Sequence, residues 1–269
     1  MRLPSPPRLL LLPILLVAAL GGCQLEPTEA GVQQRSHEEA AEQVPPLAGF
    51  TVAIDPGHNG GNGDAPEVID ELVDVGNGEK PCDTTGTNTD DGYFEHEFNF
   101  DVASRLSTLL TEAGATVLLT RTDDTGVGPC ITERTALAND AEASVSVSIH
   151  ADGGPPDGSG FHIMEPIELD GHDDGVVDSS HELALSLADT IEAVSGMPPA
   201  DYIGTDGINP RSDMGGLNLT TVPKVMVECG NMRNSHDAAL HRDPEFRQSL
   251  AQALADGITD FLIEEPAPN

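Results

Sequence analysis

The stretch that decides the fold runs from Phe50 to His58 and reads Phe-Thr-Val-Ala-Ile-Asp-Pro-Gly-His. The residues up to Ile54 are apolar or β-branched, which is typical of a buried strand, and Asp55-Pro56-Gly57 then indicates a turn. Similar short apolar runs return along the chain between stretches with helical character. This alternation predicts an α/β fold whose sheet is mostly parallel and is flanked by helices.

The sequence on either side of this stretch divides into strands, helices and loops. Between Glu95 and Ala113 the apolar residues recur at helical spacing, and Gly114 ends the pattern. Residues 59–92 are rich in Gly, Asn, Asp and Thr and predict a long loop. Further helices are expected at residues 132–141, 179–194 and 244–263, and strands at 50–54, 116–120, 144–149, 160–164 and 225–227.

The chain of 269 residues is strongly acidic, because 46 Asp and Glu against 12 Lys and Arg give a net charge of −34. Hydrophobic residues make up 38%, so one domain of ordinary size can still bury a core. A nucleic-acid partner is not expected, because phosphates are bound by clusters of basic side chains that this sequence lacks. An acidic surface stays soluble at high salt, so a saline habitat is one hypothesis for the source.

The N-terminus has the pattern of an export signal. Arg2 and Arg8 precede an apolar run that is too short, and too broken by Pro13, for a membrane span. The run ends at Gly21-Gly22-Cys23, where the sequence resembles a bacterial lipoprotein signal whose cysteine is lipidated. We therefore expect a signal peptide at residues 1–22, a lipid-anchored flexible tether at 23–48 and an extracytoplasmic domain at 49–265.

Polar side chains stand where three of the predicted strands end. His58 follows the first strand, His150 follows a later one, and Glu228 comes directly after residues 225–227. Parallel strands bring their carboxyl ends to one edge of a sheet, so these groups could converge there, and Glu95 opens a helix that can point to the same edge. Two His and one Glu would give Zn²⁺ three protein ligands and leave one position open for water. The second carboxylate, Glu228, could take a proton from that water.

Each of these residues also has a simpler interpretation. A single His at a strand end usually forms a hydrogen bond, and Glu95 alone fits the helix macrodipole as an N-terminal acid. Glu228 is harder to explain in this way, because a carboxylate beside an apolar strand needs a partner or a raised pKa. The combination of the four residues therefore favours a metal site.

Four motifs, in this order, resemble those of the zinc-dependent N-acetylmuramoyl-L-alanine amidases, which cleave the bond between muramic acid and L-alanine in peptidoglycan. The resemblance extends from about Phe50 to Leu262, and it implies a single domain with a mixed six-stranded sheet flanked by helices. It also implies one Zn²⁺ per chain, bound by His58, Glu95 and His150, with Glu228 as the catalytic acid and base. The motifs are Ala53–His58, Glu95 with Asn99, Val147–Asp152 and Pro223–Glu228.

Other residues near the motifs are candidates for supporting roles. His96 and Glu97 are rival ligands beside Glu95, and the spacing to Asn99 in the family pattern favours Glu95. His162 is expected to pack or to form hydrogen bonds. Two residues near positions where the family contacts substrate are Arg211, one of few cations available for the carboxylates of the peptide stem, and Asn231.

The cysteines fit an oxidising compartment. With Cys23 lipidated, Cys82 and Cys130 remain in polar loops and are predicted to form a disulfide that holds residues 59–92 over the zinc site. Cys229 follows Glu228 and is predicted to be a buried free thiol.

The stretch Asp170–His181 partly matches a calcium-binding loop. His172 and His181 stand where oxygen ligands are needed, so a solvated acidic loop is expected instead.

The amidase resemblance implies hydrolysis of peptidoglycan or muropeptides, the lipoprotein-type signal predicts export and membrane anchoring, and a monomer is expected. Two alternatives remain: a non-catalytic peptidoglycan-binding lipoprotein that kept the fold and the metal, and another zinc peptidase that acts on wall peptides. A binding protein would have no need for Glu228 as a base, and the products of digested muropeptides would separate the two enzyme classes.

Overall fold

The structure is a computed structural model that describes residues 44–169 and 174–264. A mixed six-stranded sheet forms its centre, with the strands in the order β4-β1-β5-β8-β6-β7. Neighbouring strands are parallel except for the antiparallel pair of β6 and β8, which confirms the predicted fold class. The strands are β1 (Thr51–Pro56), β4 (Thr116–Leu119), β5 (Val145–Asp152), β6 (His162–Pro166), β7 (Ile208–Arg211) and β8 (Lys224–Asn231).

The two faces of this sheet differ in polarity because side chains alternate along each strand. One face carries the β-branched residues of the three central strands, which belong to the main hydrophobic core. The other face carries polar residues in register across the strands: Asp55 lies beside Ser148, and His150 lies beside Glu228. Glu228 is in turn paired with His162.

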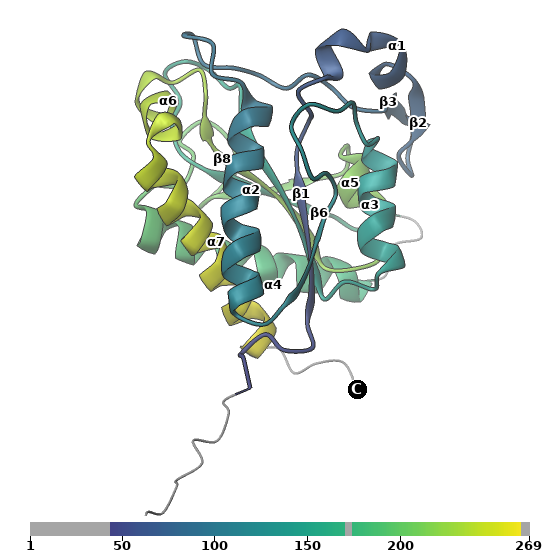
Figure 1. Ribbon diagram of the computed structural model, residues 1–269, viewed down its shortest axis with the longest axis vertical. Coiled ribbons are helices and arrows are strands. Elements are labelled where there is room, and N and C mark those ends of the chain that lie inside the picture. Colours follow the sequence, from purple (N-terminus) through teal and green to yellow (C-terminus); the bar gives the residue numbers. More distant parts are fainter. Residues whose placement is uncertain (1–43, 170–173, 265–269) are drawn as a thin grey trace, which may run out of the picture. The chain divides into compact units, whose positions relative to one another are not determined.

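Helices cover both faces (Figure 1). The apolar face packs against α2 (Glu95–Glu112), α4 (Asp174–Thr190) and α7 (Pro244–Glu264), which add most of the remaining core residues. The polar face is covered by α3 (Ile131–Asp140) and by the short α5 (Gly215–Asn218), which contribute only small apolar clusters. The polar face is therefore less densely filled with apolar side chains and can hold a functional site.

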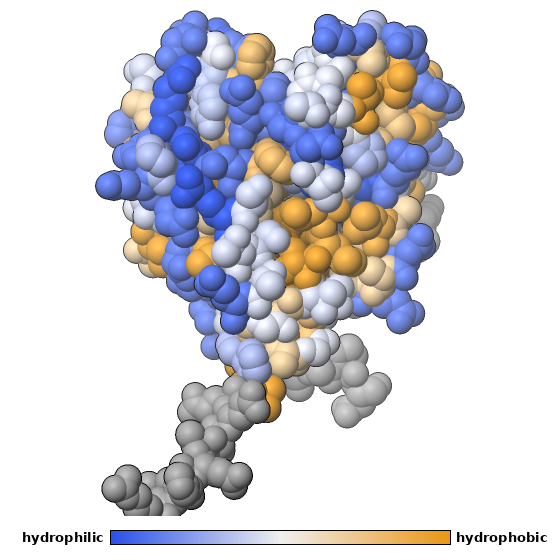
Figure 2. Space-filling model, viewed as in Figure 1, coloured by the Kyte–Doolittle hydropathy of each residue, from blue (hydrophilic) through white to orange (hydrophobic). Residues whose placement is uncertain are grey.

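The segment expected as a long loop contains regular structure, so that prediction was wrong in this respect. It forms a 3₁₀ turn (Asn62–Asp64), α1 (Pro66–Ile69) and a two-stranded sheet of β2 (Leu72–Asp74) and β3 (Glu79–Pro81). The elements are too short for a periodic pattern to predict. This segment stands at the end of the molecule toward which β1 runs, and the surface is hollowed between it and the helices α2 and α6 (Figure 2).

Other elements were missed or misplaced by the sequence patterns. Strand β7, helix α5 and helix α6 (Ser235–Arg242) are all short and were not predicted. Of the acidic stretch at residues 170–181, the part from Asp174 onward belongs to α4 rather than to a loop, and residues 170–173 lie outside the described part. The predicted signal peptide, Cys23 and most of the tether also lie outside it. Among the described residues, no helix has the length and apolar character that crossing a membrane requires.

Candidate active site

Three neighbouring strands bring functional side chains into one row on the polar face of the sheet. His150 on β5 pairs with Glu228 on β8, and Glu228 pairs with His162 on β6. His150 and Glu228 lie inside their strands rather than after them, because β5 continues to Asp152 and β8 to Asn231. The register therefore places the two residues side by side near the carboxyl ends of the parallel strands.

His58 and Glu95 complete a cluster around His150. Oε1 of Glu95 lies 3.2 Å from Nε2 of His58 and 3.0 Å from Nδ1 of His150. One ligand atom from each of the three residues lies within 4.8 Å of the others. Glu95 is the first residue of α2, so the start of this helix delivers its carboxylate to the sheet edge.

The backbone around the cluster has no room for larger side chains. A Cβ atom on Gly57 would lie 2.1 Å from Cε1 of His150, and His58 itself has a φ of 59°. The Asn99 side chain donates to the Gly57 carbonyl at 3.2 Å and to Oε1 of Glu95 at 3.3 Å. Asn99 thus links the turn after β1 to the carboxylate on α2. Its contact with Glu95 explains why the two residues are spaced four positions apart, one turn of the helix.

The second nitrogen of His58 is held from outside the cluster. Its Nδ1 donates to the Thr84 carbonyl at 3.0 Å and lies 3.5 Å from Oδ1 of Asp83. Burial alone would lower the pKa of His58, but the carboxylates of Glu95 and Asp83 outweigh it and raise the pKa to about 10. Because Nδ1 is held by the Thr84 carbonyl, Nε2 is the nitrogen that faces Glu95 and that would ligate a metal.

The two rival ligands beside Glu95 point elsewhere. His96 pairs with Asp124 at 2.8 Å, and the carboxylate of Glu97 accepts from the backbone N–H of Phe94 at 3.4 Å. Glu95 is therefore the member of this trio that faces His58 and His150.

Glu228 is buried beside the cluster, with 8% of its surface exposed. Its Oε2 is buried without a hydrogen-bond partner among the described residues. Burial raises the pKa of Glu228 well above its usual value, and the negative charges of Glu95 and Asp152 raise it further. A buried carboxylate with a free oxygen and a raised pKa suits a group that exchanges protons.

A hydrogen-bonded group lies beyond Glu228. Asp152 accepts from the Tyr202 hydroxyl at 2.9 Å and pairs with Nε2 of His162 at 3.3 Å. His162 also lies 3.4 Å from the Asn209 amide. His162 thus forms hydrogen bonds in the buried row, as its strand position predicted.

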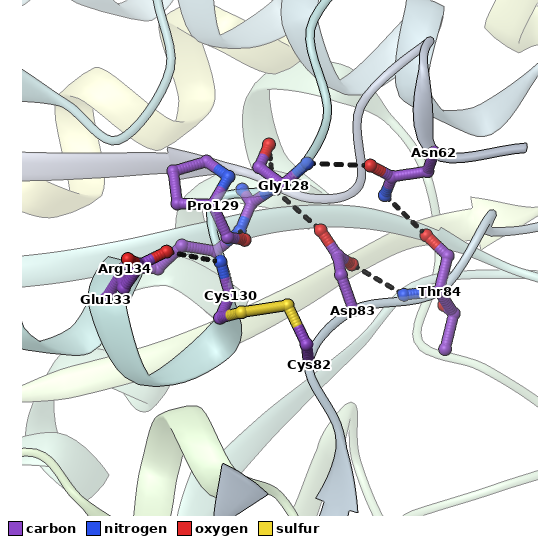
Figure 3. The surroundings of a disulfide bond; sticks show 9 residues. All are labelled: Asn62, Cys82, Asp83, Thr84, Gly128, Pro129, Cys130, Glu133 and Arg134. Carbon is purple, nitrogen blue, oxygen red and sulfur yellow. Dashed lines mark hydrogen bonds and ion pairs between the residues drawn. A yellow bond between two sulfur atoms is a disulfide. The ribbon is translucent and has the colours of Figure 1, made fainter. Parts of the chain in front are cut away.

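Arg134 is the main site residue that the sequence analysis missed. This buried side chain, on α3, bonds to Asp55 at 2.9 Å and to Asp83 at 3.0 Å. It also donates to the His58 carbonyl at 3.0 Å. One guanidinium therefore joins the end of β1 to the segment that follows β3, and Figure 3 shows Arg134 on the Asp83 side of this link. The signal that could have found it is the scarcity of basic residues in so acidic a chain.

The predicted disulfide is present between Cys82 and Cys130 (Figure 3). It joins the end of β3 to the start of α3, next to Asp83 and Thr84, which contact His58. Cys229 is a buried free thiol, as predicted.

The two residues considered for substrate contact have partners of their own. Asn231 is fully buried and donates to the carbonyls of Pro155 and Gly158, at 2.7 and 2.8 Å, so its amide nitrogen is already engaged. Arg211 forms two hydrogen bonds with Asp213, at 2.7 and 2.8 Å, so its charge is already compensated.

The donor set of the cluster fits a zinc ion. Two imidazoles and one carboxylate are ligands that Zn²⁺ accepts, and three protein ligands leave a position open. A nearby cation would also reduce the electrostatic repulsion between the carboxylates of Glu95 and Glu228. The cluster could therefore hold a divalent metal, with Glu228 beside the open position.

Known proteins resemble this chain in sequence. The family model described as N-acetylmuramoyl-L-alanine amidase matches residues 52–260. An N-acetylmuramoyl-L-alanine amidase of Mycobacterium tuberculosis is 43% identical over 221 residues, which cover 81% of this chain and 89% of that protein.

Solved structures of amidases also resemble this chain in sequence and in fold. The crystal structure of the N-acetylmuramyl-L-alanine amidase Ami1 from Mycobacterium smegmatis is 45% identical with a TM-score of 0.77, covering 81% of this chain and 99% of that one. The apo form of Ami1 from Mycobacterium abscessus is 42% identical with a TM-score of 0.75, covering 80% and 100%. The match in sequence and in structure over four-fifths of the chain shows that this protein belongs to the N-acetylmuramoyl-L-alanine amidase family.

Proposed function

We propose that this protein hydrolyses the amide bond between N-acetylmuramic acid and L-alanine in peptidoglycan, with one zinc ion per chain. The observation that supports this most directly is the convergence of His58, Glu95 and His150 next to the buried carboxylate of Glu228. Family membership supports the same reaction.

His58, Glu95 and His150 would hold the zinc ion. When bound, the ion supplies Lewis-acid chemistry for the scissile carbonyl and for the attacking water. Asn99 orients Glu95, and Thr84 fixes the protonated nitrogen of His58, so the three ligand atoms are placed before the metal binds.

Glu228 would transfer the protons. Its free Oε2 accepts a proton as water attacks the amide carbonyl, and the same oxygen then donates that proton to the departing amine of L-alanine. Its raised pKa in the buried row keeps the proton available for the second step. The carboxylate is restored when the stem peptide leaves.

The substitution Glu228→Gln tests this assignment. We expect it to lower kcat by about a thousandfold or more, because an amide cannot accept and donate the proton. Zinc should remain bound, because residue 228 is not one of the proposed metal ligands. Hydrolysis of muramoyl peptides would be followed by mass spectrometry, and zinc would be measured in the purified protein.

His150→Ala serves as the contrasting variant and should lose both zinc and activity. Near-normal hydrolysis by Glu228→Gln would contradict the role of Glu228. Products other than free peptides that begin with L-alanine would indicate a different zinc peptidase, and absence of any hydrolysis would favour a binding protein.

We also propose that the enzyme is exported and works as a monomer tethered to the membrane through a lipid on Cys23. The cell-wall substrate of the family and the motif that ends in Cys23 support this. Cys23→Ala should move the protein from the membrane fraction to the soluble exported fraction. An unchanged membrane fraction would contradict the lipid anchor.

A further inference from the structure

A cavity of about 200 Å³ extends from the candidate active site along the polar face of the sheet. His58 and His150 line one part of it, and Lys224 and Met226 line another. Lys224 and Glu228 lie on the same face of β8, four residues apart, which is roughly 13 Å along the strand. The cavity therefore leads from the proposed metal ligands His58 and His150 to Lys224, the first residue of β8.

Lys224 is an unusual residue to find there. It is one of the two lysines in the sequence, and only 1% of its surface is exposed. Among the described residues its ammonium nitrogen makes no hydrogen bond, while its backbone N–H donates to the Ser180 hydroxyl at 3.0 Å. An ammonium in so enclosed a place is unfavourable unless water or a ligand accepts its hydrogen bonds.

The other cations in the described part of the chain are already paired. The described residues contain nine Lys and Arg, since Arg2, Arg8 and Arg35 of the chain's 12 lie outside them. Eight of these nine form ion pairs with carboxylates, and Lys224 alone does not. In a chain with 46 acidic residues, one buried cation that forms no ion pair within the described residues points to an acid supplied from elsewhere.

The charge nearest to Lys224 does not satisfy it. Asp55 attracts Lys224 electrostatically, but its oxygens already accept from Arg134, Thr120 and Ser148. Burial lowers the pKa of Lys224, and a carboxylate beside the amine would oppose that shift.

We propose that Lys224 binds a carboxylate of the stem peptide when the substrate amide lies at the His58–Glu95–His150 cluster. This inference rests on the proposed function and names the residue that would select the acidic form of the stem. The apolar side chains of Ile131 and Met226 in the cavity wall suit the aliphatic part of such a residue. Lys224 is then a specificity-determining residue rather than a member of the catalytic group.

The test compares two substrates: a muramoyl peptide with free stem carboxylates, and the same peptide with those carboxylates converted to primary amides. The wild-type enzyme should hydrolyse the free acid with a kcat/KM about tenfold or more above that of the amide, since a charge-assisted hydrogen bond is lost. Lys224→Met should remove this preference by slowing hydrolysis of the acid alone. Arg105→Met, which removes the same charge from the outer side of α2, should keep the wild-type ratio.

Equal rates of the wild-type enzyme on both substrates would overturn the inference, even if Lys224→Met failed to fold. An equal loss on both substrates in a folded Lys224→Met variant would also overturn it, because it would mean that Lys224 only balances Asp55. If the wild-type enzyme hydrolysed neither substrate, the proposed function would fail, and this inference with it.

Discussion

Gly57 shows how closely the backbone approaches the cluster. It follows β1 directly, and its carbonyl accepts from Asn99, so it is held against the start of α2. Because any Cβ at this position would overlap the ring of His150, only glycine leaves that imidazole where it meets Glu95. In the Asp-Pro-Gly-His motif the glycine is therefore needed because it leaves room for the His150 ring, and the histidine is needed as a proposed metal ligand.

Gly57→Ala should displace His150 and weaken zinc binding. We expect about a hundredfold loss of kcat/KM, because a shift of about 1 Å in a reacting group has an effect of this order. Zinc content and hydrolysis of a muramoyl peptide would be measured together.

Gly78→Ala is the matched control, because a Cβ at Gly78 meets nothing within 4 Å. It should behave like the wild-type protein. Full activity of Gly57→Ala would show that His150 can move without loss of function.

The first strand, the segment after β3 and helix α3 are joined by buried polar contacts rather than by apolar packing. Arg134 supplies these contacts, and the disulfide adds a covalent link beside it. Burial would raise the pKa of Asp55, but Arg134, Lys224 and two hydroxyl groups hold it far below its usual range. Asp55 therefore stays charged, and the ends of these elements depend on one another.

Arg134→Met should destabilise the fold strongly, because it leaves the carboxylates of Asp55 and Asp83 buried without their shared partner. The free energy of unfolding should fall by about 3–5 kcal/mol, as is typical when one partner of a buried ion pair is removed. Urea unfolding followed by circular dichroism would measure this loss.

Arg105→Met breaks a partly exposed pair with Asp101 and provides the comparison. Its cost should stay within about 1 kcal/mol. Equal costs for the two variants would contradict the importance given to the buried network.

The acidity of the whole protein sets its electrostatic balance. Most carboxylates of the described residues are exposed to solvent, and the surface in Figure 2 is largely hydrophilic over α2 and α7. With a net charge of −34, mutual repulsion destabilises the folded state until salt screens it. The same repulsion would slow the approach of an acidic substrate, which increases the value of a cation inside the site.

Added salt should therefore stabilise the protein. Between about 0.01 M and about 1 M NaCl the Debye length falls from roughly 30 Å to roughly 3 Å, so the thermal midpoint should rise by several degrees. Differential scanning calorimetry would record it. The gain should be smaller at about pH 4.5, where many carboxylates are protonated, and a midpoint that ignores salt at neutral pH would contradict this account.

The sequence by itself determined the α/β fold class, the disulfide partners and the two histidines of the cluster, and it favoured Glu95 as the third member. These follow from local signals: β-branched runs, helical spacing from Glu95, and short motifs that place polar groups at strand ends. Short elements such as β2, β3, β7 and α5 could not be predicted, because three or four residues carry no measurable period.

Only the tertiary structure decided which of the neighbouring acids faces the two histidines. It also showed that Arg211 and Asn231 already have hydrogen-bond partners, whereas the Lys224 ammonium has none among the described residues. The reason is physical. Whether a charged side chain is paired or buried depends on residues far away in the chain, such as Asp213 for Arg211. Arg134 contacts Asp55, which lies 79 positions earlier in the sequence, and no local sequence pattern extends that far.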